Sequence, residues 1–237
     1  MPKASLKNSL VTGVRVVTGE TLALLDTTGT LTQKYQARLV PGKEPLELIS
    51  SEDTELIQEC LGGRVPNSFE ILPTGNPEAN SLIPIAELFK KMSPLVGRLI
   101  VDPGIDQERN RGGELHREIC LALGYKKTAD DGQFPDVRHQ LLEVKLQTSP
   151  TIDLGLVTPS SEEPLDVPQI NKLQIRHCDV RYALFYGKLE GKGVRLSHFY
   201  LTTGRDFFSR FPQFGGRVLN RKLQIPLPKD FFPHEAE

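Results

Sequence analysis

The feature that most constrains the fold of this 237-residue chain is the segment 135–145, Pro-Asp-Val-Arg-His-Gln-Leu-Leu-Glu-Val-Lys. It ends one short apolar run and begins another. Because side chains alternate between the two faces of a strand, Glu143 and Lys145 are expected on one face and their apolar neighbours on the other. If residues 137–140 turn the chain back as a hairpin, Asp136 lies beside Glu143. The segment therefore predicts two carboxylates and one ammonium at a polar site backed by an apolar layer.

A helix is expected directly before this segment, over residues 109–124. Its apolar stripe is formed by Leu115, Ile119, Ala122 and Leu123, which recur at helical spacing. Gly124 suits the C′ position at the helix end. Glu114 and Glu118 lie one turn apart on a neighbouring face, so an acidic side chain can approach the polar site from this helix.

Two carboxylates beside a lysine suit phosphodiester hydrolysis, in which water must become nucleophilic and charge must be stabilised at phosphorus. Mg²⁺ held by one or two carboxylates serves both needs and keeps several waters. Asp136 and Glu143 are the expected ligands, and the backbone carbonyl of Val144 can add a third oxygen. We expect Lys145 to orient the attacking water and to stabilise charge. Glu114 can bind a second metal or hold a ligand water.

The pattern Pro135-Asp136, then Glu143-Val144-Lys145, with Glu114 on the preceding helix, resembles the PD-(D/E)xK nuclease superfamily and, within it, the type II restriction endonucleases. The resemblance covers residues 109–201, where the expected order of helix, strand, strand, helix and strand fits the family core. It implies an α/β fold with a restriction-endonuclease-like core, in which helices flank a mixed central β-sheet. It also implies that Asp136 and Glu143 are metal ligands, Lys145 the catalytic lysine and Glu114 an auxiliary acid.

The same resemblance implies a Mg²⁺-dependent homodimer that cuts double-stranded DNA at a specific short sequence and leaves 5′-phosphates. The gap between Asp136 and Glu143 is short for most restriction enzymes, and similar spacing occurs in the strand-nicking endonuclease of methyl-directed mismatch repair and its restriction-enzyme relatives, so it leaves open whether one strand or both are cut. A repair nickase or junction-resolving endonuclease on the same core is therefore an alternative. A non-catalytic DNA-binding protein with structural acids is another.

An acid-x-Lys triplet occurs twice in the chain, and the context separates the two copies. Glu190-Gly191-Lys192 lies in a glycine turn with no upstream Pro-Asp, so it is expected to be a solvated hairpin. The first copy also has a purely structural interpretation, in which Asp136 and Lys145 form a surface salt bridge that adds little stability. The corresponding structural interpretation of Glu114 is a helix N-terminal acid that the helix macrodipole stabilises.

The chain is expected to divide near residue 100. Residues 1–100 would form an α+β extension serving DNA recognition or dimerisation, and residues 101–237 the nuclease core. In the first part we expect a hairpin over 14–25, a strand over 34–40, helices over 51–62 and 84–92, and a loop over 64–80. In the second we expect a loop over 158–168, helices over 168–177 and 203–210, and strands over 181–187, 194–201 and 223–227.

Charge is distributed unevenly along the chain. Residues 101–170 hold 7 basic and 13 acidic residues, whereas residues 171–237 hold 12 basic and 6 acidic residues. An acidic centre beside a basic third suits a metal site next to a polyanion-binding surface, although ordinary surface variation gives the same pattern. The residues expected to contact DNA are Arg109, Asn110, Arg111, Gln147, Lys172 and Arg176.

No apolar run approaches the roughly 20 residues that span a bilayer, and the first residues lack the apolar stretch of a signal peptide. Neither a membrane association nor export is therefore expected. Cys60, Cys120 and Cys178 lie far apart, without a Cys-x-x-Cys pair. They are expected to be buried free thiols in the reducing cytoplasm, with no zinc site.

Overall fold

The computed structural model describes residues 2–4, 11–14, 16, 35–62, 70–101, 107–155, 157–214 and 231–232. The chain forms two units, Met1–Lys34 with Gly215–Glu237, and Tyr35–Phe214. In the first unit, β1 (Pro2–Ala4) pairs antiparallel with β2 (Val11–Val14). The hairpin expected over 14–25 and the strand expected over 223–227 fall largely or wholly outside the described residues.

The larger unit is a mixed α/β structure with a five-stranded mixed sheet, as expected. Its long antiparallel pair is β8 (Arg181–Glu190) with β9 (Gly193–Thr203). The strand β6 (Leu142–Gln147) runs parallel to β8, and β4 (Leu46–Leu48) runs parallel to β9. The short β5 (Leu99–Val101) pairs antiparallel with the start of β9.

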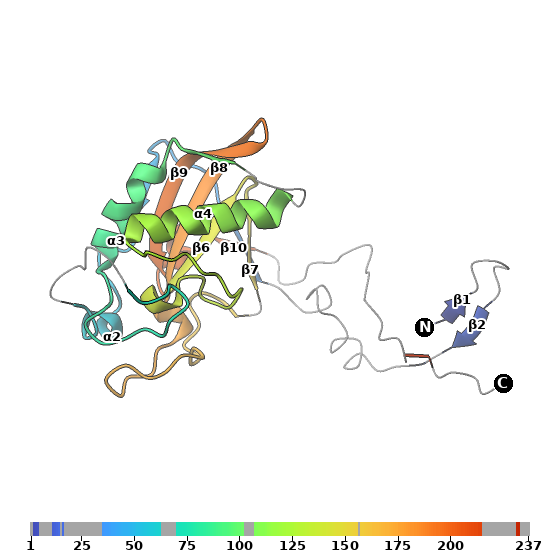
Figure 1. Cartoon of the computed structure of the whole chain (residues 1–237), viewed down its shortest axis with the longest axis horizontal. Coiled ribbons are helices and arrows are strands. Elements are labelled where there is room, and N and C mark those ends of the chain that lie inside the picture. Colours follow the sequence, from blue (N-terminus) through green and yellow to red (C-terminus); the bar gives the residue numbers. More distant parts are fainter. Residues whose placement is uncertain are drawn as a thin grey trace. The chain divides into compact units, whose positions relative to one another are not determined.

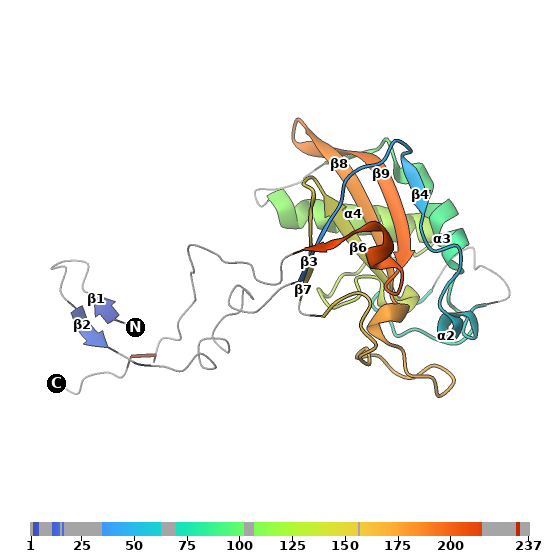
Figure 2. The same cartoon turned by 180° about the vertical axis from the view of Figure 1, so that it is seen from behind.

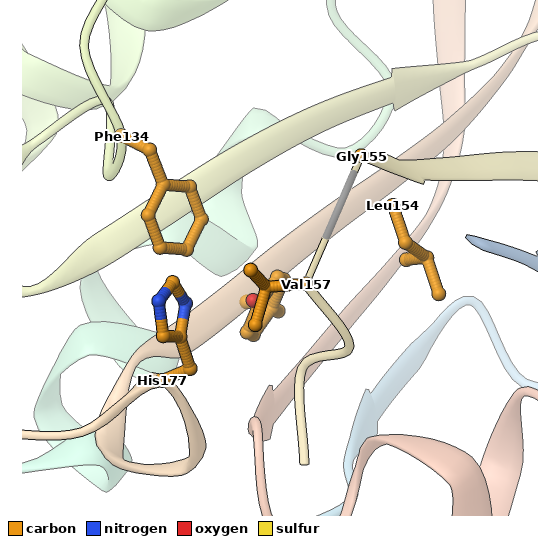
Figure 3. Close-up of a pocket in the computed structure, with 6 residues that line it drawn as sticks. Phe134, Leu154, Gly155, Val157 and His177 are labelled. Carbon is orange, nitrogen blue, oxygen red and sulfur yellow. The ribbon is translucent and has the colours of Figure 1, made fainter. Parts of the chain in front are cut away.

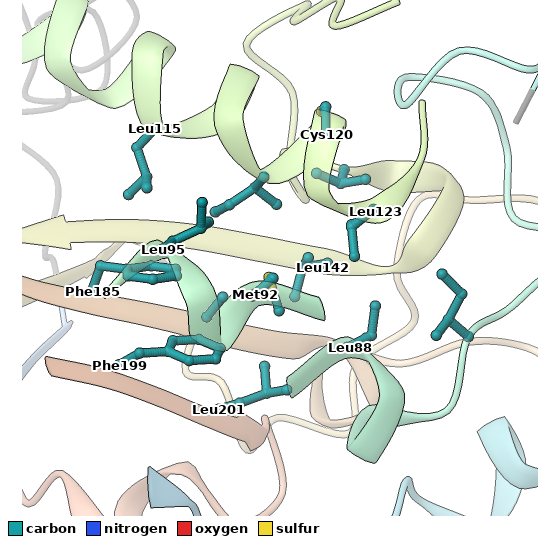
Figure 4. Packing of buried hydrophobic residues seen from close by; sticks show 14 of the residues in the cluster. Leu88, Met92, Leu95, Leu115, Cys120, Leu123, Leu142, Phe185, Phe199 and Leu201 are labelled. Atoms are coloured by element: carbon teal, nitrogen blue, oxygen red, sulfur yellow. The ribbon is translucent and has the colours of Figure 1, made fainter. Parts of the chain in front are cut away.

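Two helices cover one face of this sheet, α3 (Ile85–Met92) and α4 (Gln107–Leu123). Figure 1 shows α4 crossing in front of the sheet, and Figure 2 shows it behind. Between helices and sheet lies one hydrophobic core, into which Leu115 and Leu123 of α4 point toward Leu142 and Phe185 (Figure 4). The α4 stripe is confirmed except at Ala122, which is only half-buried. Gly124, with a φ of +100°, ends the helix as predicted.

A second core occupies the opposite face of the sheet. It lies against a small antiparallel sheet of β10 (Gln213–Phe214), β3 (Tyr35–Arg38) and β7 (Thr151–Gly155). The short helices α2 (Glu55–Gln58) and α5 (Phe207–Arg210) border it, and Phe207 is fully buried there. The two cores therefore sandwich the strand that carries Glu143 and Lys145.

Some expected elements differ from the structure. The helix expected over 51–62 is reduced to α2, which begins after Thr54, and the Thr54 hydroxyl donates to Asp179 instead of capping the helix. The helix expected over 168–177 is absent, because Asn171 and Lys172 adopt left-handed conformations that close a tight turn. The segment ends in a single 3₁₀ turn, His177–Asp179. Likewise α5 begins after Asp206, later than the expected start at Thr203.

The division expected near residue 100 does not coincide with a boundary in the structure. The elements α3 and β4 lie within the first hundred residues and β5 straddles residue 100, yet all three complete the sheet and core of the 35–214 unit. In the described part of the chain, no helix combines the length and apolarity needed to cross a membrane. All three cysteines are buried free thiols, as expected.

Candidate active site

The predicted hairpin between Asp136 and Glu143 is closed by a single pair of residues. Val137 and Leu142 exchange two backbone hydrogen bonds, of 2.9 and 3.2 Å. Between them the chain makes a 3₁₀ turn, Arg138–Gln140, and then a left-handed residue, Leu141, with a φ of 47°. The Leu141 side chain is fully buried in the second core, which offsets the cost of this conformation. The short spacing is thus accommodated by one strained, well-packed residue.

This turn brings Asp136, Glu143 and Lys145 together. The backbone N–H of Asp136 donates to Oε2 of Glu143 at 3.3 Å, and the backbone N–H of Val144 donates to Oδ2 of Asp136 at 2.8 Å. The ammonium of Lys145 donates to Oε1 of Glu143 at 3.0 Å. The predicted alternation is confirmed, since Leu142, Val144 and Leu146 contact the core under α4.

Burial and crowding of negative charge dominate the electrostatics of the site. Burial, followed by the nearby charge of Glu143, raises the pKa of Asp136 to about 7, although the hydrogen bond from Val144 opposes the change. Burial alone would lower the pKa of Lys145, but the charge and hydrogen bond of Glu143 outweigh it and leave that pKa above its usual value. The site therefore has a charged lysine, and any added positive charge would stabilise the ionised form of Asp136.

The residues present fit a hard divalent cation. No group of three or more His, Cys, Asp and Glu side chains able to hold a metal occurs within the described ranges. The acids that could hold a cation here are Asp136 and Glu143, which the hydrogen bond from the Asp136 N–H to the Glu143 carboxylate brings together. Mg²⁺ is commonly bound by one or two carboxylates and completes its shell with water and substrate phosphate. The raised pKa of Asp136 points to the same chemistry, because a cation would relieve the repulsion between the two acids.

Glu114 does not take the place that the sequence suggested. Its carboxylate is bound by Arg117, one turn along α4, through hydrogen bonds of 2.7 and 3.0 Å. Arg117 therefore neutralises the charge of Glu114. Glu118 similarly forms ion pairs with Arg98 and Arg117. Glu114 is absent from the lining of the cavity that α4 shares with Asp136.

A cavity of about 160 Å³ lies between residues of α4 and β6 and reaches Asp136. The lining residues are Gly112, Gly113, Leu115, His116, Asp130, Asp136, Val144 and Leu146. His116 is buried, with Nε2 at 3.3 Å from both the Ala129 carbonyl and Sγ of Cys120. Its Nδ1 is buried without a hydrogen-bond partner among the described residues.

Sequence reasoning left His116 unassigned and did not single out Asp130. The available signals were the pair Gly112-Gly113, which leaves open space beside the helix, and the i, i+4 spacing of His116 and Cys120. Neither signal indicates which way the helix is rotated, so neither identifies the residue that faces Asp136.

The residues expected to contact DNA differ in their surroundings. Gln147 lines a polar pocket of about 420 Å³ together with Lys145 and Asp153. Arg176 is instead bound to Asp179 at 3.1 Å, and Lys172 stands exposed in a turn. The side chains of Arg109, Asn110 and Arg111, in the first turns of α4, lie outside the described part of the chain.

The second triplet is an exposed hairpin tip, as expected. Glu190 ends β8 and forms an ion pair with Arg195, with about half of each side chain exposed.

No protein-family model matches the chain, and no curated protein or solved structure matches it significantly.

Proposed function

We propose that this protein is a Mg²⁺-dependent endonuclease that hydrolyses double-stranded DNA and leaves 5′-phosphates, and that it acts at a specific short sequence as type II restriction enzymes do. The observation that carries the proposal is the hydrogen-bonded set of Asp136, Glu143 and Lys145, in which 2.8–3.3 Å contacts join all three residues through the Val144 backbone and the Glu143 carboxylate. The proposed fold family is a restriction-endonuclease-like core, with a homodimer as its working form.

Each residue of the set has a separate task in this proposal. Asp136 and Glu143 hold the cation, and Mg²⁺, when bound, would neutralise the phosphate oxygens and favour ionisation of the attacking water. Lys145 is charged, and 19% of its side chain is exposed. It orients that water and stabilises the charge that develops at phosphorus. The backbone N–H of Val144 fixes the orientation of the Asp136 carboxylate.

The test is cleavage of plasmid DNA by the purified protein with and without Mg²⁺. Asp136→Asn and Lys145→Ala should each lower the cleavage rate by on the order of 100-fold or more while DNA binding remains measurable. The matched control is Lys192→Ala, which alters the second acid-x-Lys triplet on an exposed turn and should cut like the natural chain. Full turnover in both site variants would contradict the assignment.

The second candidate is a nicking enzyme, because the short gap that the single-pair turn closes is similar to that of the strand-nicking endonuclease of mismatch repair and its restriction-enzyme relatives, and so leaves open whether one strand or both are cut. Product topology separates the two candidates. Linear plasmid whose sequenced ends share one short motif supports restriction, whereas open-circular plasmid as the end product supports a repair nickase or junction-resolving enzyme.

A further inference from the structure

An apolar cavity of about 230 Å³ lies on the Glu143 face of the sheet, apart from the polar pockets already described. Its lining residues are Phe134, Leu154, Gly155, Val157, His177 and Tyr182. Figure 3 shows the Phe134 ring next to the His177 ring, with Val157 beside them and Leu154 farther along. Among the described residues, the lining contains no Lys, Arg, Asp or Glu, so none of them offers a permanent counter-charge to a charged ligand group.

The wall of this cavity is largely aromatic. Phe134 stacks on His177 with ring centroids 5.5 Å apart and an interplanar angle of 19°, and the Tyr182 ring is 6.3 Å from Phe134. Phe134 keeps 39% of its surface exposed, which leaves part of an aromatic face without a protein partner. A Cβ at Gly155 would meet nothing within 4 Å among the described residues other than its chain neighbours, so there is open space beside this glycine. The ligand class that suits these surfaces is a flat, uncharged aromatic ring system.

The cavity adjoins the acid pair through two of its residues. Phe134 stands two positions before Asp136 in the chain. Tyr182 is the register partner of Glu143 in the parallel β6–β8 pair, so both side chains project from the same face of the sheet. A ring in the cavity and a phosphate held at Asp136 and Glu143 are therefore near enough to be parts of one molecule.

We propose that this cavity receives one unstacked base of the nucleic acid that is cut at Asp136 and Glu143, an inference that rests on the proposed function. The cavity is smaller than the roughly 300–1,000 Å³ typical of sites for drug-sized ligands, so it suits a single ring system. Every base offers a π-face, and stacking on aromatic side chains binds bases with little dependence on sequence. The half-buried His177 imidazole is a polar group in the wall that can meet the edge of the base.

Removal of the base from its stack also changes the backbone beside it. An extruded nucleotide rotates about its backbone, which changes the orientation of the phosphates that flank it. With the base held by Phe134, one of these phosphates would be displayed to the acids on the neighbouring turn. The base site is therefore a positioning device for cleavage as well as a binding site.

The experiment measures binding of a short single-stranded oligonucleotide that contains 2-aminopurine, by fluorescence anisotropy in metal-free buffer. The chain contains no Trp, so its own emission interferes little with the probe. Phe134→Ala should weaken binding by roughly tenfold or more, since loss of one base–aromatic stack corresponds to a factor of this order. Val157→Trp, which fills the cavity, should have the same effect. Leu189→Ala, an exposed apolar residue at the end of β8, should bind like the natural chain.

Plasmid cleavage by the same variants separates this inference from the proposed function. Asp136→Asn should bind the oligonucleotide normally and fail to cut, whereas Phe134→Ala should lose both binding and cleavage efficiency by similar factors. If the natural chain cuts DNA and Phe134→Ala binds and cuts equally well, the base site is wrong and the nuclease stands. If Phe134-dependent binding occurs without any cleavage, the nuclease proposal is wrong and the base site stands. An oligonucleotide that does not bind the natural chain at all overturns the base site.

Discussion

Asp136 is the residue at which the stability of the fold and the proposed chemistry conflict. Its carboxylate is half-buried, accepts a hydrogen bond from the Val144 backbone and stands beside the charge of Glu143. A group so placed is stabilised in its neutral form, while metal binding requires the charged form. The metal-free protein therefore carries an electrostatic cost at this position that a bound cation would remove.

We expect this cost to appear as a pH dependence of stability. The pKa of Asp136 is about 7 in the folded protein, whereas an aspartate in the unfolded chain has its ordinary pKa of 3.8. Between these values the folded state retains a proton that the unfolded state has released. The free energy of unfolding should therefore fall as the pH rises from about 4 to 7. Asp136→Asn removes this loss and should be more stable than the natural chain at pH 8, by on the order of a few kcal/mol, when unfolded with urea in metal-free buffer.

The control for this prediction lies within the same pair of proteins. Below pH 4 both residues are uncharged, so the difference in unfolding free energy should largely disappear. Added Mg²⁺ at pH 8 should raise the Tm of the natural chain and leave that of Asp136→Asn nearly unchanged. A variant that is less stable than the natural chain at every pH would show that the carboxylate is not strained.

Leu141 shows what a single residue contributes to the site. Local conformational preference does not predict a leucine in the left-handed region, where glycine or asparagine is the usual residue. The sequence pattern predicted a turn between Asp136 and Glu143 and left its geometry open. The geometry of the turn is decided by the full burial of the Leu141 side chain, together with the hydrogen bond that the Arg181 backbone N–H donates to the Leu141 carbonyl.

At the scale of elements, Arg181 and Asp53 connect the segment before α3 to the start of β8. Arg181 is fully buried, with Nε 3.4 Å from Oδ1 of Asp53 and Nη2 donating to the Ile83 carbonyl at 2.7 Å. The other oxygen of Asp53 accepts the N–H of Ile85, the first residue of α3. Burial lowers the pKa of Arg181. This pair joins residues from the first hundred to the strand that borders β6.

Breaking the buried pair should destabilise the protein strongly. Asp53→Ala leaves the Arg181 charge without a counter-charge, and the expected loss in the free energy of unfolding is about 3–5 kcal/mol. The matched control is Glu190→Ala, which breaks an exposed pair with Arg195 and should cost less than about 1 kcal/mol. Equal losses in urea denaturation of the two variants would mean that the buried pair does not hold the two segments together.

Elements with a strong local pattern were predictable, and those that depend on distant partners were not. The helices α3 and α4 carry apolar stripes and end signals, and β8 and β9 flank a glycine turn, so their positions follow from the sequence. The strands β4 and β5 have three residues each and exist through pairing with β9. Such short strands have no periodicity of their own from which to be predicted.

On the scale of the whole molecule, the uneven charge distribution remains the main pointer to a polyanionic partner. The acidic residues gather in the stretch that contains the candidate site, and the basic residues follow it. Within the described residues, Arg176, Arg195, Arg205 and Arg210 are occupied by ion pairs with acids. DNA binding through this region would have to break those pairs. Each phosphate contact that forms would release counterions from the DNA, and this release makes binding sensitive to ionic strength.

Binding of duplex DNA by Asp136→Asn, which does not cut, should therefore weaken steeply as salt is added. The logarithm of the affinity is expected to fall linearly with the logarithm of salt concentration, with a slope of about −0.9 for each phosphate contact. A duplex with uncharged methylphosphonate linkages is the control, because it has no condensed counterions and should give little slope. A flat response with natural DNA would contradict a polyanion-binding surface.

The sequence by itself determined the features that depend on neighbours along the chain: the alternation that separates Glu143 and Lys145 from the apolar face, the α4 stripe and its glycine end, and the return of Asp136 toward Glu143. Only the tertiary structure decided that His116 rather than Glu114 lines the cavity at Asp136, and that Phe134, His177 and Tyr182 meet in one aromatic wall. The physical reason is that local spacing places residues on a face of an element, whereas the direction in which that face points is set by packing against segments far away in the chain.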